Sequence, residues 1–576
     1  MESVDRGDVQ RGDVQRGDVQ RRDVLRVGAV AAVAGATGLG LSACTTPTTA
    51  EPLPRPLTGA ELLEALWPSV SRRRLEAVLP RDPSAPVALA VPGSRSALVV
   101  GGGIAGLSAA LELVERGYSV TLREAAPEFG GRLATRDLDP GLGRTFRVEH
   151  GLHMWFDNYR VFRDLRDRLG INDRFRPYTA VNFVFRSLLP ERLVSEPKVF
   201  PLNLANIIET SPNLDWPDIF SSLGISADVL GFRFDGLYER NDAETFLAWI
   251  ERVKVNSKFR DVVMLPAAHV TLNRVEDLSA SEMLLYQHLY FTSQPFAFDR
   301  EITTVDHGTA IIDPWVARLR SLGATVMAAS PIPGLRFEGN RAVGVIGEAV
   351  EYDWVILATD VPGARSVLAG SVGTDAVSAA ALDACRARIA PMGVAPPYRI
   401  LRIWFDRPLA AERPDVIETP EHSPISLICQ FHQLEDESQA WAAATGGSII
   451  EFHLYALDDE VAMLPDDEVW AHIRPTVLEV VPELAAANVV GQTIGNYENF
   501  TAFSVGMGIL RPFCDSLESD GVANLRLCGD WVQSPAPSAL MERAAMTGRQ
   551  AANACLFVDG VREVGYHHVA RTGPLA

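Results

Sequence analysis

The stretch that most constrains the fold of this chain runs from Ser96 to Ala125 and reads SALVVGGGIAGLSAALELVERGYSVTLREA. An apolar run predicts a first strand, a glycine-rich loop follows it, and an amphipathic helix is expected to about Arg116. Gly117 ends that helix, and YSVTLRE predicts a second strand that ends at Glu124. This is the order of a βαβ unit, which predicts an α/β fold with a Rossmann-type nucleotide-binding domain.

The glycines of the loop have separate tasks in such a unit. Gly101 permits the tight turn after the strand, Gly103 lets the backbone approach a pyrophosphate, and Gly106 lets the helix pack closely on the strand. The helix N-terminus, which carries about half a positive charge, then faces the phosphates. Glu124 lies where a carboxylate accepts hydrogen bonds from ribose hydroxyls. The cofactor contacts predicted for this unit are Gly101, Gly103, Ile104, Ala105, Gly106 and Glu124.

The segment EFGGRLATR indicates which dinucleotide binds, because it places Gly130, Gly131 and Arg132 directly after the βαβ unit. This segment resembles the GG-R extension of the superfamily of flavin amine oxidases and carotenoid desaturases, in which the arginine contacts the FAD pyrophosphate. Arginine suits that task through its planar, bidentate donors. NAD enzymes do not show the extension, so the resemblance implies FAD. It also implies a glutathione-reductase-like FAD-binding domain with an inserted α+β substrate domain.

Later segments resemble the rest of the FAD site of this superfamily. YDWVILATD resembles the strand that returns to the FAD domain, and GATVMAASPIPGLRFEGNRAVGV resembles its β-hairpin. LRLCGDWVQSPAPSALMERAAMTG resembles its closing flavin motif. The adenine, ribityl–phosphate and flavin-ring contacts that this resemblance implies are Ile332, Gly529, Asp530, Leu540 and Met541, in addition to Gly131 and Arg132.

The same resemblance divides the chain into domains. It predicts an FAD-binding domain assembled from 96–190, 300–395 and 500–560, and a substrate domain from 190–300 and 395–500. Residues 45–95 are expected to form a tether and a short helical linker.

Four further segments narrow the resemblance to carotenoid desaturases. VEHGLHMWFDNY resembles carotenoid desaturases in general. YRILRIWFDRPL, GGSIIEFHLYA and PSALMERAAMTG are most similar to the isorenieratene synthase type, which desaturates carotenoid β-rings. The implied function is FAD-dependent desaturation of an apolar isoprenoid, with a carotenoid as substrate and a quinone or oxygen as electron acceptor. A flavin amine oxidase and a non-catalytic, flavin-bound isoprenoid carrier are the alternatives. Amine oxidases usually carry a lysine near the flavin on the strand corresponding to 398–402, where this chain has none.

The reacting groups are less well marked than the cofactor site. His153 is the candidate catalytic residue because it follows the GG-R segment closely, and His150, Asp157 and His307 also lie next to segments expected to face the flavin. Arg402 and Glu542 could form a buried ion pair near the ring. The aromatic stretch 283–298 is compatible with a substrate tunnel, a membrane-dipping helix or ordinary core.

The first fifty residues resemble a targeting segment. Three RGDVQ repeats, expected to be disordered, precede RRDVLR (21–26), which resembles a twin-arginine signal. An apolar run of fifteen residues, 27–41, is short for a membrane span, which needs roughly twenty. LSAC then resembles a lipobox that ends in Cys44. The region 1–44 therefore predicts export and lipid anchoring of Cys44 to a membrane of the cell envelope, with a cytoplasmic, membrane-associated protein as the alternative.

Composition excludes some partners. The formal net charge of −20 disfavours binding to nucleic acid. The six cysteines show no CxxC spacing and no cluster with histidine, so no metal site is predicted.

Overall fold

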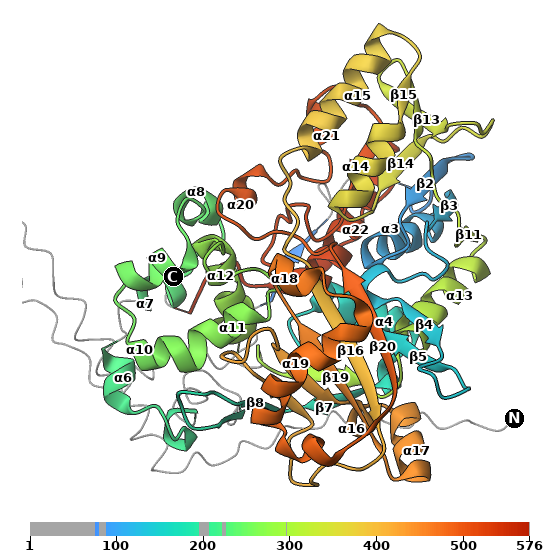
Figure 1. Cartoon of the computed structure of the whole chain (residues 1–576). Coiled ribbons are helices and arrows are strands. Elements are labelled where there is room, and N and C mark those ends of the chain that lie inside the picture. Colours follow the sequence, from blue (N-terminus) through green and yellow to red (C-terminus); the bar gives the residue numbers. More distant parts are fainter. Residues whose placement is uncertain (1–74, 80–87, 195–206, 222–225, 295–296, 575) are drawn as a thin grey trace, which may run out of the picture. The chain divides into compact units, whose positions relative to one another are not determined.

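A five-stranded parallel sheet contains the predicted βαβ unit (Figure 1). The computed structural model describes residues 75–79, 88–194, 207–221, 226–294, 297–574 and 576. The order of the sheet is β11 (Thr325–Met327), β3 (Ser119–Arg123), β2 (Ser96–Val100), β14 (Trp354–Leu357) and β21 (Leu525–Leu527). This arrangement confirms the predicted α/β, Rossmann-type fold, in which a ligand lies at the carboxyl ends of the strands.

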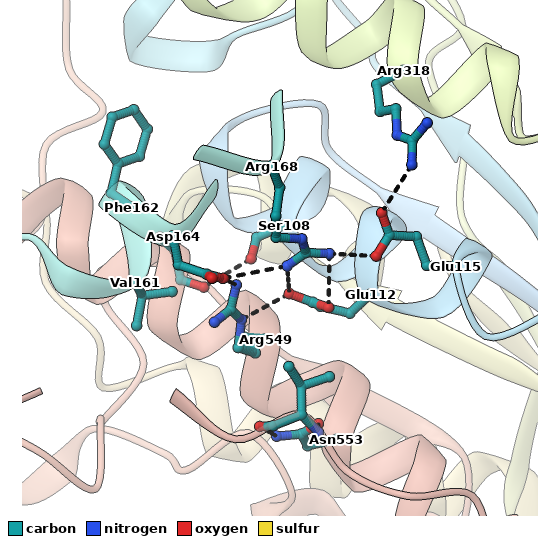
Figure 2. Close-up of polar contacts among 12 residues, drawn as sticks. Ser108, Glu112, Glu115, Val161, Phe162, Asp164, Arg168, Arg318, Arg549 and Asn553 are labelled. Atoms are coloured by element: carbon teal, nitrogen blue, oxygen red, sulfur yellow. Dashed lines mark hydrogen bonds and ion pairs between the residues drawn. The ribbon is translucent and has the colours of Figure 1, made fainter. Parts of the chain in front are cut away.

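The helix that follows the glycine loop is more buried than its sequence suggests. Helix α3 (Ile104–Val114) is buried at every residue, although its pattern predicted an amphipathic helix with one exposed face. Helix α22 (Leu540–Val558) covers that face, and Ser108 Oγ donates to the carbonyl of Ala545 at 2.9 Å. A Cβ at Gly548 would lie 2.2 Å from the carbonyl oxygen of Ala105, so close packing of the two helices requires glycine there. The only acidic side chain of α3 itself, Glu112, is buried among arginines (Figure 2).

A second, mixed sheet carries most of the segments between the Rossmann strands. Its order is β20 (Val489–Tyr497), β16 (Tyr398–Phe405), β19 (Ser448–Leu454), β18 (Leu427–Gln430), β17 (Val416–Glu418), β8 (Ala180–Phe183) and β9 (Glu191–Val194). Helix α19 (Asp466–Val480) packs on one face through a hydrophobic cluster that includes Leu401, Phe452 and Ile473. The opposite face carries Arg402 and Glu451, which are direct partners across β16 and β19. Strand β8 begins at residue 180, about ten residues ahead of the predicted domain boundary at 190.

The structure also contains smaller sheets. They are β6 (Trp155–Phe156), β10 (Arg300–Thr303) and β7 (Phe175–Tyr178); β4 (Thr135–Leu138) and β5 (Phe146–Glu149); and β13 (Arg341–Val345), β12 (Leu335–Glu338) and β15 (Val372–Gly373). Within the predicted tether and linker, 45–95, Leu75–Val78 form strand β1, which pairs with β22 (Tyr566–Val569) near the C-terminus. Most of the segment in which a short helix was predicted lies outside the described residues.

The remaining α-helices surround these sheets. They are α4 (Arg160–Leu169), α6 (Trp216–Phe220), α7 (Ser226–Val229), α8 (Leu237–Asn241), α9 (Phe246–Arg252), α10 (Ser257–Phe259), α11 (Leu265–His269), α12 (Ala280–Gln287), α13 (Asp313–Ser321), α14 (Val361–Gly370), α15 (Ala376–Ile389), α16 (Phe431–Leu434), α17 (Asp436–Thr445), α18 (Asp459–Ala462), α20 (Met507–Leu510) and α21 (Ser516–Ser519). Every residue of α12 is buried, so the part of the aromatic stretch that lies in this helix does not face lipid. Among the described residues, no helix is both long and apolar enough to cross a membrane.

Candidate functional site

The predicted glycine loop lies at the carboxyl edge of the parallel sheet, where β2 passes into α3. Gly101 has φ +110°, and a Cβ there would lie 2.7 Å from the carbonyl oxygen of Ala358 on the loop after β14. A Cβ at Gly106 would lie 1.9 Å from the carbonyl oxygen of Gly101. At Gly103, in contrast, the nearest atom to an added Cβ would be 3.9 Å away. Close backbone contacts within the protein therefore require glycine at positions 101 and 106. At Gly103 no atom of the protein is close, so the backbone there is open to a ligand.

Glu124, the residue predicted to bind the ribose hydroxyls, lies against the glycine loop. Glu124, at the end of β3, accepts hydrogen bonds from the backbone N–H groups of Gly102 at 2.7 Å and Ala126 at 2.8 Å. Ile332 lies on the connection between β11 and β12, ahead of the hairpin to which the resemblance assigned it. The backbone N–H of Ser330 on that connection donates to the carbonyl of Glu124. The structure thus brings the β3 and β11 ends together.

The GG-R segment joins the same edge. The N–H of Gly130 donates to the carbonyl of Gly102 at 2.9 Å, and Gly131 opens a short 3-10 helix that presents Arg132. Arg132 Nη2 donates to Asp530 Oδ1 at 2.6 Å, which joins two predicted contacts that are 398 positions apart. Burial alone would raise the pKa of Asp530, but the Arg132 charge outweighs it and lowers that pKa. The other carboxylate oxygen, Oδ2, is buried with no hydrogen-bond partner among the described residues.

The closing motif completes this edge with a second helix N-terminus. Helix α22 begins at Leu540, whose φ of 49° turns the chain from the extended Ala539 into the helix, and Met541 follows in its first turn. Gly529 has φ +142°, and a Cβ there would lie 2.8 Å from the indole nitrogen of Trp531. Loops after β2, β3 and β21 and the N-termini of α3 and α22 therefore surround one region.

A buried polar cluster lies on the face of the mixed sheet that α19 leaves free. Arg402 Nε donates to Glu451 Oε2 at 2.8 Å, and Arg402 Nη1 lies 3.6 Å from Glu435 Oε2. Both partners carry their carboxyl groups into the interior, because Glu435 precedes α17 and Glu451 is central in β19. Burial opposes ionisation of Glu451, but Arg402 and His453 outweigh it and lower its pKa. The predicted pair of Arg402 with Glu542 is wrong: Glu542 instead accepts from the N–H groups of Val161 and Phe162 at the start of α4.

Glu149 extends the cluster towards the predicted catalytic segment. Its Oε2 accepts from the backbone N–H of His307 at 2.8 Å and lies 3.1 Å from His307 Nδ1. Burial, together with the neighbouring charge of Glu435, raises the pKa of Glu149 well above its ordinary value. Burial also raises the pKa of Glu435, to about 7. This end of the cluster therefore holds a proton at neutral pH.

His153, the predicted catalytic residue, lies beside these groups. Its Nδ1 is 2.9 Å from the carbonyl oxygen of Gly151, and its ring meets that of His307 edge-on with centroids 5.0 Å apart. Since a carbonyl only accepts, Nδ1 carries the hydrogen and Nε2 keeps its lone pair. Burial lowers the pKa of His153 to about 4, so the ring is neutral at pH 7. Gly151 has φ +99°, and a Cβ there would lie 2.9 Å from His453, which fixes this segment against β19.

His150 packs against Tyr398 and Tyr497. Its Nε2 lies 2.7 Å from the hydroxyl of Tyr398, which donates to Asn499 Oδ1 at 3.0 Å. Its ring stacks on Tyr497 with centroids 3.5 Å apart. Asp157 is separate from this group, because its Oδ2 accepts from the buried amide of Gln294.

Sequence reasoning missed Glu149, Glu435, Glu451 and His453. A signal for two of them was present, since GGSIIEFHLYA places a glutamate and a histidine two positions apart in an otherwise apolar strand. Alternate residues of a strand share a face, so two polar side chains on a buried strand predict a common polar site.

Comparison with known proteins identifies the family. The family model described as flavin containing amine oxidoreductase matches residues 104–556. The chain belongs to this family. It is therefore an FAD-dependent oxidoreductase, as the glycine loop and the GG-R segment predicted.

The similar proteins cover most of the chain. A carotenoid phi-ring synthase of Streptomyces griseus is 30% identical over 82% of this chain and 90% of its own length. A carotenoid phi-ring synthase of Chlorobaculum tepidum is 25% identical over 81% of this chain and 89% of its own length. A solved structure of putrescine oxidase, at 17% identity, aligns over 81% of this chain and 99% of its own with a TM-score of 0.56, which supports the fold alone.

The residues at the carboxyl edge fit FAD. The open surface at Gly103 and the N-terminus of α3 can receive a pyrophosphate, and the Arg132 guanidinium supplies a cation beside it. The unpartnered Oδ2 of Asp530 is an acceptor for a cofactor hydroxyl. The individual contacts of these residues with FAD remain predictions.

Proposed function

We propose that this flavoprotein desaturates an apolar isoprenoid, a carotenoid end ring, at the site formed by the GG-R edge and the His153 segment. The observation that carries the proposal is the similarity to two carotenoid phi-ring synthases over about four fifths of the chain. The interior of strand β16 supports it too, because its eight residues, YRILRIWF, include no lysine of the kind amine oxidases use.

The energetics of the substrate agree with this assignment. Moving a charged amine into an apolar pocket without a partner costs several kcal/mol. A carotenoid ring carries no such cost, and each buried methylene contributes roughly 0.8 kcal/mol.

The residues of the chain have distinct tasks in this reaction. When bound, FAD supplies the two-electron acceptor for C–H oxidation. Arg132 and Asp530 orient the cofactor, and neutral His153 offers the Nε2 lone pair to a proton that leaves the substrate. A pKa of about 4 suffices for this step, because the proton leaves the carbon next to the one that loses a hydride, and a C–H bond beside such an electron-deficient carbon is strongly acidic.

We expect the FAD-loaded protein to convert β-carotene, or a related carotenoid, in liposomes that also contain a quinone. The visible spectrum should shift to the red as the conjugated system lengthens, and a product with an aromatic ring should be detectable by chromatography and mass spectrometry. Protein stripped of FAD is the control. Inertness towards all isoprenoids, together with rapid peroxide formation from polyamines, would establish the amine oxidase alternative instead.

We also propose that the protein is exported by the twin-arginine route and anchored through Cys44, with a quinone or oxygen of the envelope as electron acceptor. The supporting pattern is the order of RRDVLR, the apolar run 27–41 and LSAC, all of which lie outside the described residues. Twin-arginine export moves folded proteins, so FAD can be inserted before the protein leaves the cytoplasm. An anchored enzyme also meets a bilayer-dissolved carotenoid directly.

Replacing Arg21 and Arg22 by lysine should retain the protein in the cytoplasmic fraction, because that route requires the arginine pair. Cys44→Ser should be exported but remain without lipid, as fractionation and intact-protein mass spectrometry would show. Unchanged fractionation of the Arg21→Lys/Arg22→Lys variant would contradict export by this route. An unmodified Cys44 in the membrane fraction would contradict the anchor.

A further inference from the structure

A small cavity opens beside the buried polar cluster. It lies between the β4–β5 hairpin and strands β16, β19 and β20, and has a volume of ≈ 30 Å³. A site needs about 10–15 Å³ to hold a water molecule, so this cavity has room for water beside groups that can hydrogen-bond to it. Its inner wall includes Glu149, Arg402 and Glu451, which are all buried. Its outer wall includes Arg136, whose side chain is exposed, and Thr493.

The charge balance of the cluster requires it to hold protons. Glu149, Glu435 and Glu451 face the guanidinium of Arg402, so full ionisation of all three carboxyl groups would leave an excess of negative charge in the interior. An unpaired buried charge costs several kcal/mol, and a proton removes it. His453 lies beside Glu451, with its Nε2 2.7 Å from Glu451 Oε1 and its Nδ1 2.5 Å from the Tyr455 hydroxyl.

His307 links this cluster to the candidate catalytic residue. Its ring is fully buried, its Nδ1 lies 3.1 Å from Glu149 Oε2, and neither ring nitrogen meets the geometry of a hydrogen bond with another described residue. The edge-on contact with His153 places the two imidazoles next to each other. A neutral imidazole that donates at Nδ1 can accept at Nε2, which is the requirement for passing a proton through the ring.

We propose that His307, Glu149 and the adjoining cavity form the exit through which the proton released at the candidate site reaches solvent near Arg136. This inference rests on the proposed function. In the desaturation, two C–H bonds of the substrate break and one C=C bond forms. Bound FAD would take up one hydrogen with its electron pair, and His153 takes up the other as a proton. Glu149 already holds a proton, so it releases that proton to the cavity and takes up the new one through His307. Arg402 and Glu451 keep the electrostatic environment of the relay constant.

The first test is an infrared spectrum of the FAD-loaded protein without substrate. A protonated Glu149 gives a carboxylic C=O band that shifts in D₂O, and Glu149→Gln should remove it. Glu418→Gln is the matched control, since Glu418 is a carboxyl on β17 whose pKa burial raises to about 7 and which does not line the cavity. Persistence of the full band in Glu149→Gln would overturn the proposal.

The second test blocks the cavity. Thr493 is the cross-strand partner of Arg402 and shares its face, so Thr493→Leu should fill the cavity and slow hydrogen–deuterium exchange of the Glu149 band at least about tenfold. Ala134→Val fills it from the opposite wall and serves if Thr493→Leu does not fold. Gln492→Leu, on the neighbouring exposed position of β20, is the control and should exchange like the wild type. Equal exchange in wild type, Thr493→Leu and Ala134→Val would overturn the exit path.

Turnover distinguishes this inference from the proposed function. With a competent substrate, Thr493→Leu should lower kcat more than KM and increase the solvent deuterium isotope effect, because proton release becomes limiting. If no carotenoid reacts while both infrared results hold, the proposed substrate is wrong and the proton path stands. If carotenoids react and neither infrared result is obtained, the proton path is wrong and the proposed function stands.

Discussion

Gly103→Val should yield a folded protein that has lost its FAD. An added Cβ at this position would find no atom of the protein nearer than 3.9 Å, so the fold has room for it. The same space is where the backbone must approach the pyrophosphate, and a branched side chain would occupy it. We expect FAD affinity to fall at least about 100-fold, which corresponds to about 2.7 kcal/mol. The yellow colour of the purified protein and titration of the apoprotein with FAD measure the effect.

The neighbouring glycine provides the contrast that makes this result specific. Gly106→Val should destabilise the protein itself, because its Cβ would lie 1.9 Å from the carbonyl oxygen of Gly101. Thermal unfolding of the apoproteins should therefore separate the variants, with Gly103→Val close to wild type and Gly106→Val well below it. A fully loaded, yellow Gly103→Val protein would show that the pyrophosphate does not lie on this loop.

The FAD edge was predictable from sequence because its parts are local. Glycine triplet, helix and carboxylate lie within thirty residues, and each has a task that few other residues can perform. The pairing of Arg132 with Asp530 was beyond the reach of the sequence. The resemblance assigned each residue to the cofactor, and only the fold shows that they also bind each other.

The polar cluster could not be predicted in the same way. Glu149, Arg402, Glu435 and Glu451 come from different strands and loops, and their meeting depends on the register of β16 with β19 and on how the β4–β5 hairpin packs. A sequence shows that Arg402 lies in an apolar strand and so needs a partner. The sequence does not show which of the many carboxylates is the partner of Arg402. The predicted pair of Arg402 with Glu542 is wrong for this reason. Strand β1 could not be predicted for the same reason, because its partner strand lies almost 500 residues away in the sequence.

A buried ion-pair network clamps the helix that follows the glycine loop (Figure 2). Glu112 on α3 is fully buried, and its carboxylate lies 2.7 Å from Arg168 of α4 and 2.7 Å from Arg549 of α22. Arg549 is itself 1% exposed and also pairs with Asp164. Burial would raise the pKa of Glu112, but the arginines outweigh it and lower that pKa, so the carboxylate is ionised at neutral pH. The network therefore ties together the two helices whose N-termini lie at the FAD edge.

Glu112→Ala should lower the free energy of unfolding by about 3–5 kcal/mol, because it leaves buried guanidinium groups without their carboxylate. Glu115→Ala, at the C-terminal end of the same helix, is the control: its pairs with Arg168 and the half-exposed Arg318 are near the surface and should contribute less than about 1 kcal/mol. Denaturant unfolding of the apoproteins at pH 7 measures both. Equal effects of the two substitutions would contradict the clamp.

The pH dependence of the same pair gives an independent reading. A carboxyl whose folded-state pKa is lowered stabilises the protein above its unfolded-state pKa, near 4.5, and loses that contribution as the pH falls through the lower folded-state pKa. The stability difference between wild type and Glu112→Gln should therefore be full at pH 7 and shrink below pH 4.5. The double variant Glu112→Leu/Arg549→Leu should recover part of the loss, because removing both charges also removes the uncompensated one. A double variant less stable than either single variant would mean that the packing of α3 on α22, and not the charge pair, is what the network supplies.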